Sequence, residues 1–198
     1  ESVNNDEAVI LGHHLDDQIE TFLYRLFRGS SPLGLSVMKR ISKRDNVMLC
    51  RPLLCFPKEV INYYSKKFGI DFFHDSSNDN LNFERNYIRK KIIPNIKERW
   101  PSFHKTMRHN ITLQDTHSKI VGDFCNSIYD HIVVNKILNI STLLTYPSYL
   151  YSIFIKHWIH NEINYKLNKN EAIKITELLS SKNSEYPKYI LRNKYSII

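Results

Sequence analysis

The stretch from Ala8 to Gly34 limits what this chain can fold into more than any other part of it. It opens with four apolar residues, Ala8–Leu11, a run too short for a helix and typical of a buried parallel strand. Gly12 interrupts this run. From Leu15 onward apolar residues recur at helical spacing as far as Gly29, a typical helix stop. We therefore predict a strand, a turn and a helix, which together indicate an α/β fold.

Polar and charged residues are concentrated in the first turn of this predicted helix, at the end that follows the strand. They are His13, His14, Asp16, Asp17 and Glu20. Because side chains three and four positions apart share one face of a helix, Asp17 projects together with His13 and Glu20. Ligands of open α/β sheets bind at the carboxyl ends of the strands, which is where this turn of the helix is expected to lie. Acids and imidazoles gathered there favour binding of a cation, either a metal ion or the ammonium group of an amine substrate.

A purely structural role for these residues stays open as an alternative. Asp16 and Asp17 at the start of a helix complement its dipole, and histidines are ordinary residues in turns. Any one of these residues fits that alternative as well as it fits a binding site. The occurrence of the whole group directly after a strand favours the binding site.

Composition and charge exclude several classes of protein. A chain of 198 residues with 42% hydrophobic residues can bury a core, and its formal net charge of +8 favours a polyanionic partner. Cys50, Cys55 and Cys125 are odd in number and form no C-x-x-C pair, which argues against a disulfide framework and a structural zinc site. We therefore predict no metal site. Without a long apolar run or a signal peptide, a cytoplasmic protein that does not enter a membrane is expected.

The rest of the first half continues the α/β pattern. We predict a short strand at Val47–Cys50, a helix from Pro57 to Gly69 and a second short strand at Ile70–Phe73. A polar loop follows, and the next helix is expected to kink at Pro94.

The second half is expected to form a small, mainly helical domain that begins at Pro101. The pattern predicts a long helix over residues 102–134, helices at 148–164 and 169–181, and a hairpin of 189–191 with 195–197. We therefore predict an α/β domain over residues 1–100 and a helical domain over residues 101–198.

Two motifs extend this interpretation. The first is HHxDDxxET followed by RLxRGS and GL, within residues 13–35, and the second is D-x-SN followed by RNxxR and RWP, within residues 75–101. In this order they resemble the tRNA(Ile)-lysidine synthetase family, part of the N-type ATP pyrophosphatase (PP-loop) group. The similarity continues more weakly to the end of the chain. It implies the second half of a Rossmann-type PP-loop domain, followed by a helical, tRNA-binding domain.

The resemblance also implies a reaction and its participants. Such a ligase uses ATP, with Mg²⁺, to adenylate the wobble cytidine of the isoleucine tRNA that carries a CAU anticodon. Free L-lysine then displaces AMP, and the resulting lysidine changes codon reading from AUG to AUA. A bacterial cytoplasm or a plastid would be the location, and a homodimer is one assembly compatible with the sequence.

The site residues implied by the resemblance follow from motif positions. Asp17 and Glu20 would surround the lysine, Arg85 would face Glu20 and the activated intermediate, and His13, His14 and Asp16 would line the nucleotide. A carboxylate pair suits an ammonium substrate, and arginine suits phosphate oxygens. Basic residues concentrated in the first 110 residues are the expected tRNA contacts. These are Arg40, Lys43, Arg44, Arg89, Lys90, Lys91, Lys97, Arg99, Lys105 and Arg108.

The sequence departs from the family in one respect. The SGGxDS loop that holds the ATP pyrophosphate does not occur in these residues. We therefore expect a piece of a longer enzyme, inactive in isolation. The alternatives are a non-catalytic, basic RNA-binding module and another PP-loop tRNA-modifying enzyme, such as a thiolase, which usually carries cysteine pairs. A metal-dependent phosphohydrolase is a further alternative, and only the HHxDD motif supports it.

Overall fold

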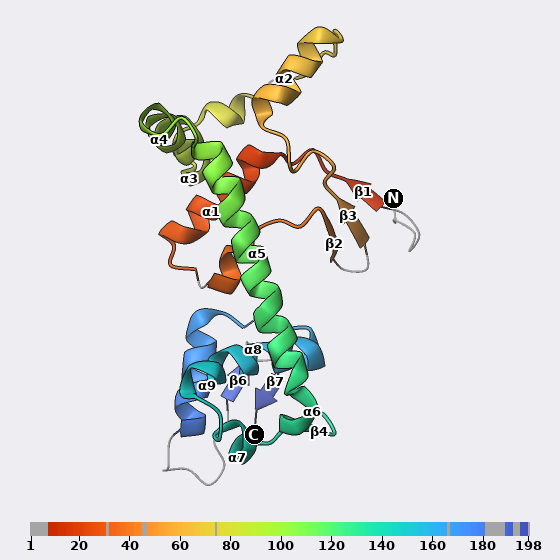
Figure 1. The fold of residues 1–198 in the computed structure, drawn as a ribbon, viewed down its shortest axis with the longest axis vertical. Helices are drawn as coiled ribbons and strands as arrows, with labels where there is room; N and C mark the ends of the chain where they lie inside the picture. The colour runs from red at the N-terminus through yellow and green to blue at the C-terminus, as the bar shows by residue number, and fades with distance from the viewer. Residues whose placement is uncertain are drawn as a thin grey trace. The chain divides into compact units, whose positions relative to one another are not determined.

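The computed structural model describes residues 8–30, 32–44, 47–73, 75–165, 167–180, 189–191 and 195–197 (Figure 1). The chain forms two compact units, residues 1–118 and 119–198. The boundary between them falls within the 25-residue helix α5 (Phe103–Ser127). The functional division expected at Pro101 lies just before α5 and stays a prediction.

A small mixed sheet opens the first unit. Its strands are β1 (Ala8–Ile10), β2 (Ile41–Arg44) and β3 (Val47–Cys50), in the order β1-β3-β2. β1 runs parallel to β3, as expected for an α/β fold, whereas β2 runs antiparallel to β3. β2 was not predicted from the sequence, because its polar residues were interpreted only as a basic run.

The prediction that the first strand is buried was wrong. Ile10 of β1 is 73% exposed. Within the described strands, β1 pairs with β3 on one side and with no strand on the other, so its apolar side chains are not enclosed on both faces.

Helix α1 (Leu15–Phe27) follows β1 with the boundaries that the sequence indicated. It ends in a Schellman turn, in which Gly29 has a φ of +71° and the Ser30 N–H donates to the Arg25 carbonyl over 3.0 Å. Leu26 and Phe27, expected on the buried face, are 46% and 60% exposed. The last turn of α1 therefore extends beyond the core.

A second helical run faces α1. It comprises α3 (Glu84–Tyr87), a π-helical turn (Ile88–Ile92) and α4 (Ile93–Arg99). The irregularity expected at Pro94 lies directly before it, as the wider π turn. Because proline has no N–H to continue the hydrogen-bond ladder, a change of helical pitch at this point is physically reasonable.

The core of the first unit lies between α1, this second run and the start of α5. It consists of Leu15, Ile19, Phe22, Leu23, Leu35, Ile88, Ile93, Phe103 and Met107. Bonds from α1 also hold the segment before β2, since the Gln18 side chain bonds both the N–H and the carbonyl of Met38. Helix α1 is therefore fixed along most of its length.

Helix α2 (Lys58–Lys67) begins after Pro57 and ends in a second Schellman turn, at Gly69, as predicted. None of its residues is buried. The strand predicted at 70–73 is absent, and Phe72 and Phe73 are 69% and 93% exposed. No neighbouring strand pairs with this segment within the described sheets, so its apolar residues do not form a strand.

The second unit is mainly helical. After α5 come α6 (Tyr129–Ile132), β4 (Val133–Val134), β5 (Ile137–Leu138), α7 (Ile140–Leu143), α8 (Tyr151–Ile163), α9 (Lys169–Ser180), β6 (Tyr189–Leu191) and β7 (Tyr195–Ile197). The two helices and the terminal hairpin agree with the prediction.

The long helix ends earlier than the predicted residue 134. It stops at Ser127, and a missed hairpin joins β4 to β5 through Asn135 and Lys136, whose φ angles are +51° and +67°. Two residues of positive φ form the tight turn that joins antiparallel strands. Among the described residues, no helix combines the length and apolarity that a membrane crossing requires.

Candidate active site

The turn between β1 and α1 is closed by a reciprocal cap. The His14 N–H donates to Asp17 Oδ2 over 2.9 Å, and the Asp17 N–H lies 3.4 Å from His14 Nδ1. His14 is the N-cap residue of α1. The structural role that the sequence left open for these residues is therefore present. It occupies only one oxygen of Asp17.

The other carboxylates of α1 meet an arginine from the π turn. Arg89 Nε lies 2.6 Å from Glu20 Oε1, and its Nη2 lies 2.9 Å from Oε2 and 3.4 Å from Asp17 Oδ1. The Glu20 side chain is only 1% exposed. The hydrogen bond that Arg89 donates to Glu20 raises the pKa of Arg89, against the opposing effect of burial. A buried carboxylate is thus neutralised by a bidentate guanidinium.

The contact to Glu20 in the described structure comes from Arg89, whereas the sequence predicted Arg85 there. The role of Arg85 at the activated intermediate stays a prediction. Arg85 instead donates to Thr21 Oγ1 over 3.0 Å. Arg85 and Arg89 stand four residues apart, as do Thr21 and Asp17, and the two helical segments run in opposite directions at this contact. A step of one turn from Arg85 to Arg89 therefore corresponds to a step of one turn back along α1, from Thr21 to Asp17.

The loop before α3 supplies a further contact to Arg89. Asn86 of α3 donates to the loop carbonyls of Ser77 and Asn80, over 3.0 and 2.8 Å, and fixes the path of the loop. Asn78 Oδ1 then lies 3.4 Å from Arg89 Nη1. The D-x-SN and RNxxR motifs are thereby joined to the HHxDDxxET motif around one guanidinium.

Asp16 contacts two elements that the sequence analysis did not connect with it. Its Oδ2 accepts the Lys58 N–H at the start of α2 over 2.7 Å, and its Oδ1 lies 3.0 Å from Nε2 of His104, on α5. His104 was missed because it follows the expected domain boundary at Pro101. The HHxDD spacing gives no signal for it. We call His14, Asp16, Asp17, Glu20 and Arg89 the acid site.

His13 stands beside the acid site. Its Nδ1 is buried without a hydrogen-bond partner in the described structure. Unpaired buried nitrogen atoms are uncommon in folded proteins, so the Nδ1 atom of His13 is an unsatisfied polar group next in sequence to the acid site. Within the same described ranges, no group of three or more His, Cys, Asp or Glu side chains is arranged to hold a metal ion.

With this geometry in view, comparison with known proteins identifies the fold. Residues 2–96 match the family described as the PP-loop domain. This chain contains a PP-loop domain. The acid site therefore lies within its PP-loop domain, apart from the contact made by His104.

Relatives of this PP-loop protein share one name. The tRNA(Ile)-lysidine synthase of Buchnera aphidicola subsp. Baizongia pistaciae is 34% identical over 196 residues, 94% of this chain and 43% of the relative. That of Wigglesworthia glossinidia brevipalpis is 39% identical over 131 residues, 66% of this chain and 33% of the relative. That of Vibrio campbellii is 31% identical over 169 residues, 85% of this chain and 37% of the relative. The chain thus spans 33% to 43% of the length of these relatives.

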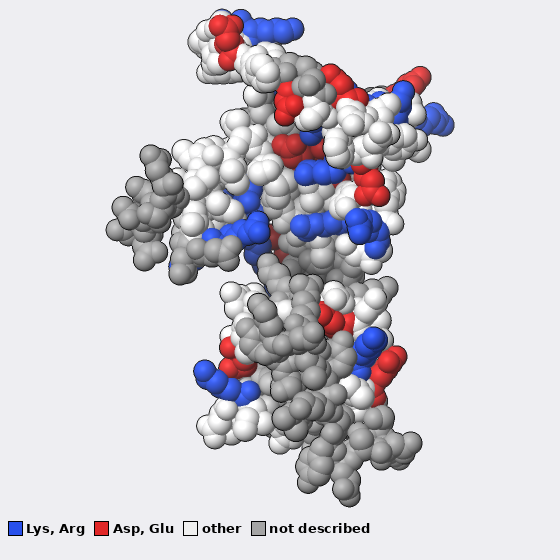
Figure 2. Space-filling view, turned by 180° about the vertical axis from the view of Figure 1, so that it is seen from behind, with Lys and Arg blue, Asp and Glu red and all other residues white. Residues whose placement is uncertain are grey.

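The basic residues expected to contact tRNA differ in their surroundings. Arg89 is occupied by the acid site, and Lys90 Nζ and Lys97 Nζ pair with Asp79 and Glu59 over 2.5 and 2.6 Å. The others are exposed, namely Arg40, Lys43, Arg44, Lys91, Arg99, Lys105 and Arg108. On the face seen in Figure 2, acidic side chains stand among the basic ones, so this face carries no unbroken positive surface.

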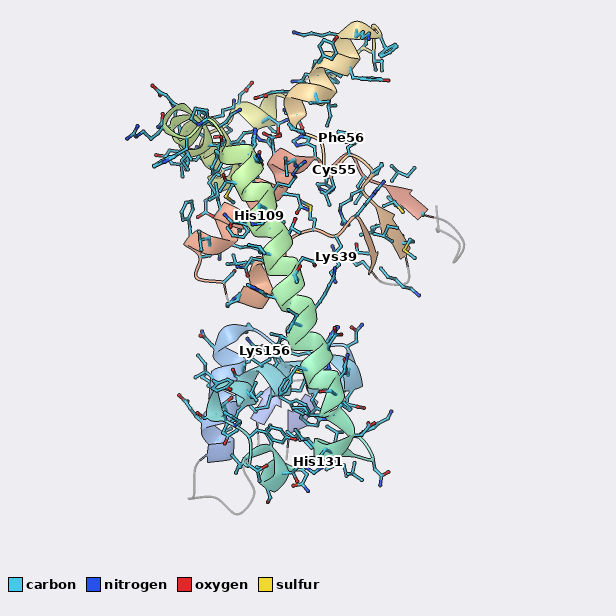
Figure 3. The ribbon with its side chains drawn as sticks, in the orientation of Figure 1. Lys39, Cys55, Phe56, His109, His131 and Lys156 are labelled. Carbon is cyan, nitrogen blue, oxygen red and sulfur yellow. The ribbon has the colours of Figure 1, made fainter. Side chains whose placement is uncertain are left out.

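The three cysteines of the PP-loop protein are unpaired, with Cys125 buried and Cys55 exposed. Cys55 and Phe56 lie in the turn that leads into α2, away from Lys39 in the segment before β2 (Figure 3). Because the cysteines neither pair nor join the acid site, they supply no visible chemistry to it.

Proposed function

We propose that this protein takes part in lysidine synthesis. In this reaction ATP activates the wobble cytidine of the isoleucine tRNA with a CAU anticodon, and free L-lysine then displaces AMP. The observation that carries the proposal is the buried Glu20 carboxylate, held by Arg89 beside Asp17 at the start of α1. The PP-loop domain and the names of the relatives support it.

Two carboxylates in a partly enclosed site suit an amine nucleophile. Lysine arrives as an ammonium ion, which cannot attack until it loses a proton. In our proposal Asp17 and Glu20 bind this ammonium group and help to remove the proton. Both oxygens of Glu20 bond Arg89, and the Glu20 side chain is 1% exposed, whereas the Asp17 side chain is 14% exposed. Asp17 is therefore the better candidate for direct contact with the ammonium group.

The arginine of the mechanism is Arg89 in this proposal, with Arg85 as its neighbour. Arg89 orients both acids. Among the described residues Arg85 bonds the Thr21 hydroxyl alone, and it is exposed, so its charge is available to phosphate oxygens of the activated intermediate.

ATP is proposed as the activating substrate, with His13 and His14 on its side of the site. The unpartnered Nδ1 of His13 supports this position. Asp16, also expected near the nucleotide, is committed to Lys58 and His104 and acts as a structural link. Mg²⁺ is proposed to arrive bound to the ATP phosphates, and no step is assigned to it at these residues.

The exposed basic residues are proposed to hold the phosphates of the tRNA, which position an RNA without reading its bases. A helical, tRNA-binding second unit and a cytoplasmic location in a bacterium or a plastid complete the proposal. No residue of the described structure argues for a homodimer in particular.

The test measures transfer of radiolabelled lysine to tRNA by the intact natural protein supplied with ATP. We expect Asp17→Asn and Glu20→Gln to reduce lysine transfer by at least a hundredfold while tRNA binding persists. Asp71→Asn, an exposed acid distant in sequence from the site, is the matched control and should transfer lysine normally. Wild-type protein that binds tRNA but transfers no lysine would support the RNA-binding module instead.

A further inference from the structure

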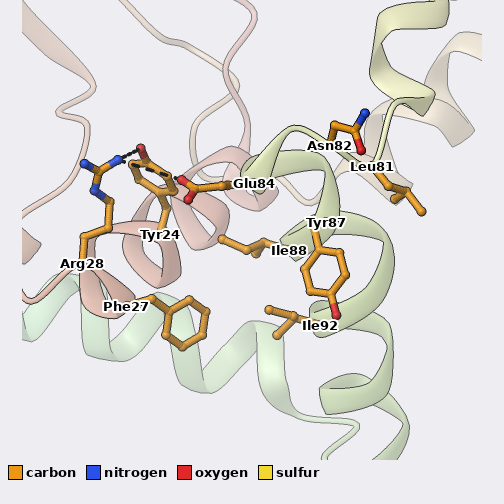
Figure 4. Close-up of a pocket in the computed structure, with 9 residues that line it drawn as sticks. All are labelled: Tyr24, Phe27, Arg28, Leu81, Asn82, Glu84, Tyr87, Ile88 and Ile92. Atoms are coloured by element: carbon orange, nitrogen blue, oxygen red, sulfur yellow. Dashed lines mark hydrogen bonds and ion pairs between the residues drawn. The ribbon is translucent and has the colours of Figure 1, made fainter.

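A second concave site lies further along α1 from the acid site. It is a pocket of about 350 Å³ between the last turns of α1 and the helical run that begins at α3 (Figure 4). Its lining residues are Tyr24, Phe27, Arg28, Leu81, Asn82, Glu84, Tyr87, Ile88 and Ile92. We call this the Tyr87 pocket. None of its residues belongs to the acid site.

Aromatic and aliphatic groups form most of the Tyr87 pocket. In Figure 4, Phe27 and Tyr87 stand on opposite sides, with Ile88 and Ile92 between them. Phe27 and Tyr87 are 60% and 51% exposed, although large aromatic side chains gain most when they are covered. The pocket therefore offers two ring faces and an apolar floor to a flat, aromatic ligand.

Polar groups at the edge of the pocket complement such a ligand. The Arg28 guanidinium lies 5.2 Å from the centre of the Tyr24 ring, donates to its hydroxyl and is 3.9 Å from Glu84 Oε2. Arg28 and Glu84 are 64% and 70% exposed, so their contact is weak and can yield to a ligand. Together with the Asn82 amide, they present donors and acceptors of the kind that read the edges of nucleobases.

The surroundings of the pocket favour a base that belongs to an RNA strand. The helical run that lines it also carries the exposed cations Arg85 and Lys91. Proteins bind single-stranded RNA through aromatic stacking combined with cationic contacts to the backbone. Charge and ring chemistry therefore point to the same kind of ligand.

The distance to the acid site fits a neighbouring nucleotide. Tyr24 is one helical turn beyond Glu20, about 6 Å along α1 at 1.5 Å per residue. On the opposite segment Ile88 directly precedes Arg89. Enzymes that modify a base commonly also contact the nucleotides on either side of it.

We propose that the Tyr87 pocket binds one unstacked base of the RNA, next in the strand to the cytidine that reacts at the acid site. This inference rests on the proposed function. It assigns a base-binding role to Phe27 and Tyr87, and it makes the Arg28–Glu84 contact a part of base recognition.

The first experiment measures tRNA affinity of the intact natural protein by fluorescence anisotropy at fixed salt. Loss of one stacked base predicts roughly 5- to 100-fold weaker binding by Tyr87→Ala. Tyr87→Phe keeps the ring and should bind within about twofold of the wild type. Tyr63→Ala is the matched control, since this α2 tyrosine is 65% exposed and outside the pocket. Wild-type affinity of Tyr87→Ala, or an equal loss in Tyr63→Ala, overturns the proposal.

A second experiment requires no substitution and so does not depend on the folding of a variant. Ultraviolet crosslinking of wild-type protein to tRNA, followed by peptide mass spectrometry, should identify a nucleotide on Phe27 or Tyr87. Crosslinks confined to other residues overturn the pocket proposal, while lysine transfer by the same preparation leaves the proposed function standing. Protein that neither binds tRNA nor transfers lysine overturns both.

Discussion

The guanidinium of Arg89 binds both carboxylate oxygens of Glu20, with Nε 2.6 Å from Oε1 and Nη2 2.9 Å from Oε2. Glu20 is among the most deeply buried side chains of the chain, although it stands on a helix next to a proposed substrate site. The pair therefore joins the stability of the first unit to the electrostatics of the site.

Removal of Arg89 should destabilise the first unit strongly. Arg89→Ala leaves the Glu20 charge buried without a partner, and breaking such a pair costs about 3–5 kcal/mol. Arg85→Ala, an exposed neighbour on the same helical run, should cost less than about 1 kcal/mol. Urea unfolding monitored by circular dichroism measures both. Equal losses in the two variants would show that the bidentate pair contributes nothing particular.

Asp16 should control the start of α2. Asp16→Ala removes the acceptor of the Lys58 N–H, and loss of a comparable helix cap costs about 0.5–2 kcal/mol. We expect faster hydrogen exchange of the amides of α2, measured by mass spectrometry. Asp71→Ala, which removes an exposed carboxylate just beyond α2, is the control. The assignment fails if exchange in α2 is the same in Asp16→Ala and the wild type.

The second unit should lose stability in mild acid. Burial, and then the nearby His160, lower the pKa of His157, whose Nε2 lies 2.8 Å from Asn126 Oδ1. The unfolded chain takes up a proton at the ordinary histidine pKa of about 6.5, whereas the folded unit takes it up only at lower pH. Unfolding therefore becomes easier as the pH falls through about 6.5 and below, and stability is unaffected by this group above about pH 7.5.

The fluorescence of Trp158, next to His157, reports this transition. His157→Gln should flatten the pH dependence, whereas His109→Gln in the first unit should leave it unchanged. An equally steep loss of stability in His157→Gln would contradict the assignment.

The two compact units should respond separately to a change in the core of one of them. Ile155 is fully buried in the second unit, and Ile155→Ala should destabilise that unit by about 2–5 kcal/mol. Ile137, 72% exposed, is the control, and its alanine variant should change stability by less than about 0.5 kcal/mol. Trp158 reports the second unit and Trp100 the first. A common shift of both transitions would argue against two units.

Local signals in the sequence predicted much of the fold. Gly29 and Gly69 end α1 and α2 where they were expected to, because a helix that closes in a Schellman turn needs a residue of positive φ there. The helical spacing of apolar residues predicted α8 and α9, because this spacing is likewise a local property of the sequence. The polar strand β2 was missed, since its pairing with β3 depends on residues that follow it in the chain.

The site was predicted less completely, because its partners come from distant segments. The acids at the start of α1 could be found from their spacing alone. The choice between Arg85 and Arg89 depends on the phase of one helix against another, which an RNxxR motif does not contain. His104 reaches Asp16 from 88 positions away in the sequence. No local pattern predicts such a contact.

Helix α2 has no buried side chain, so little packing opposes its unfolding while the rest of the first unit stays folded. A helix of ten residues is shorter than the roughly 12–15 that remain marginally helical alone in water. Its persistence depends on its end contacts, chiefly the bond that the Lys58 N–H donates to Asp16 and the turn at Gly69. We therefore expect the α2 segment to become accessible to a protease before α1, which stays folded around Glu20.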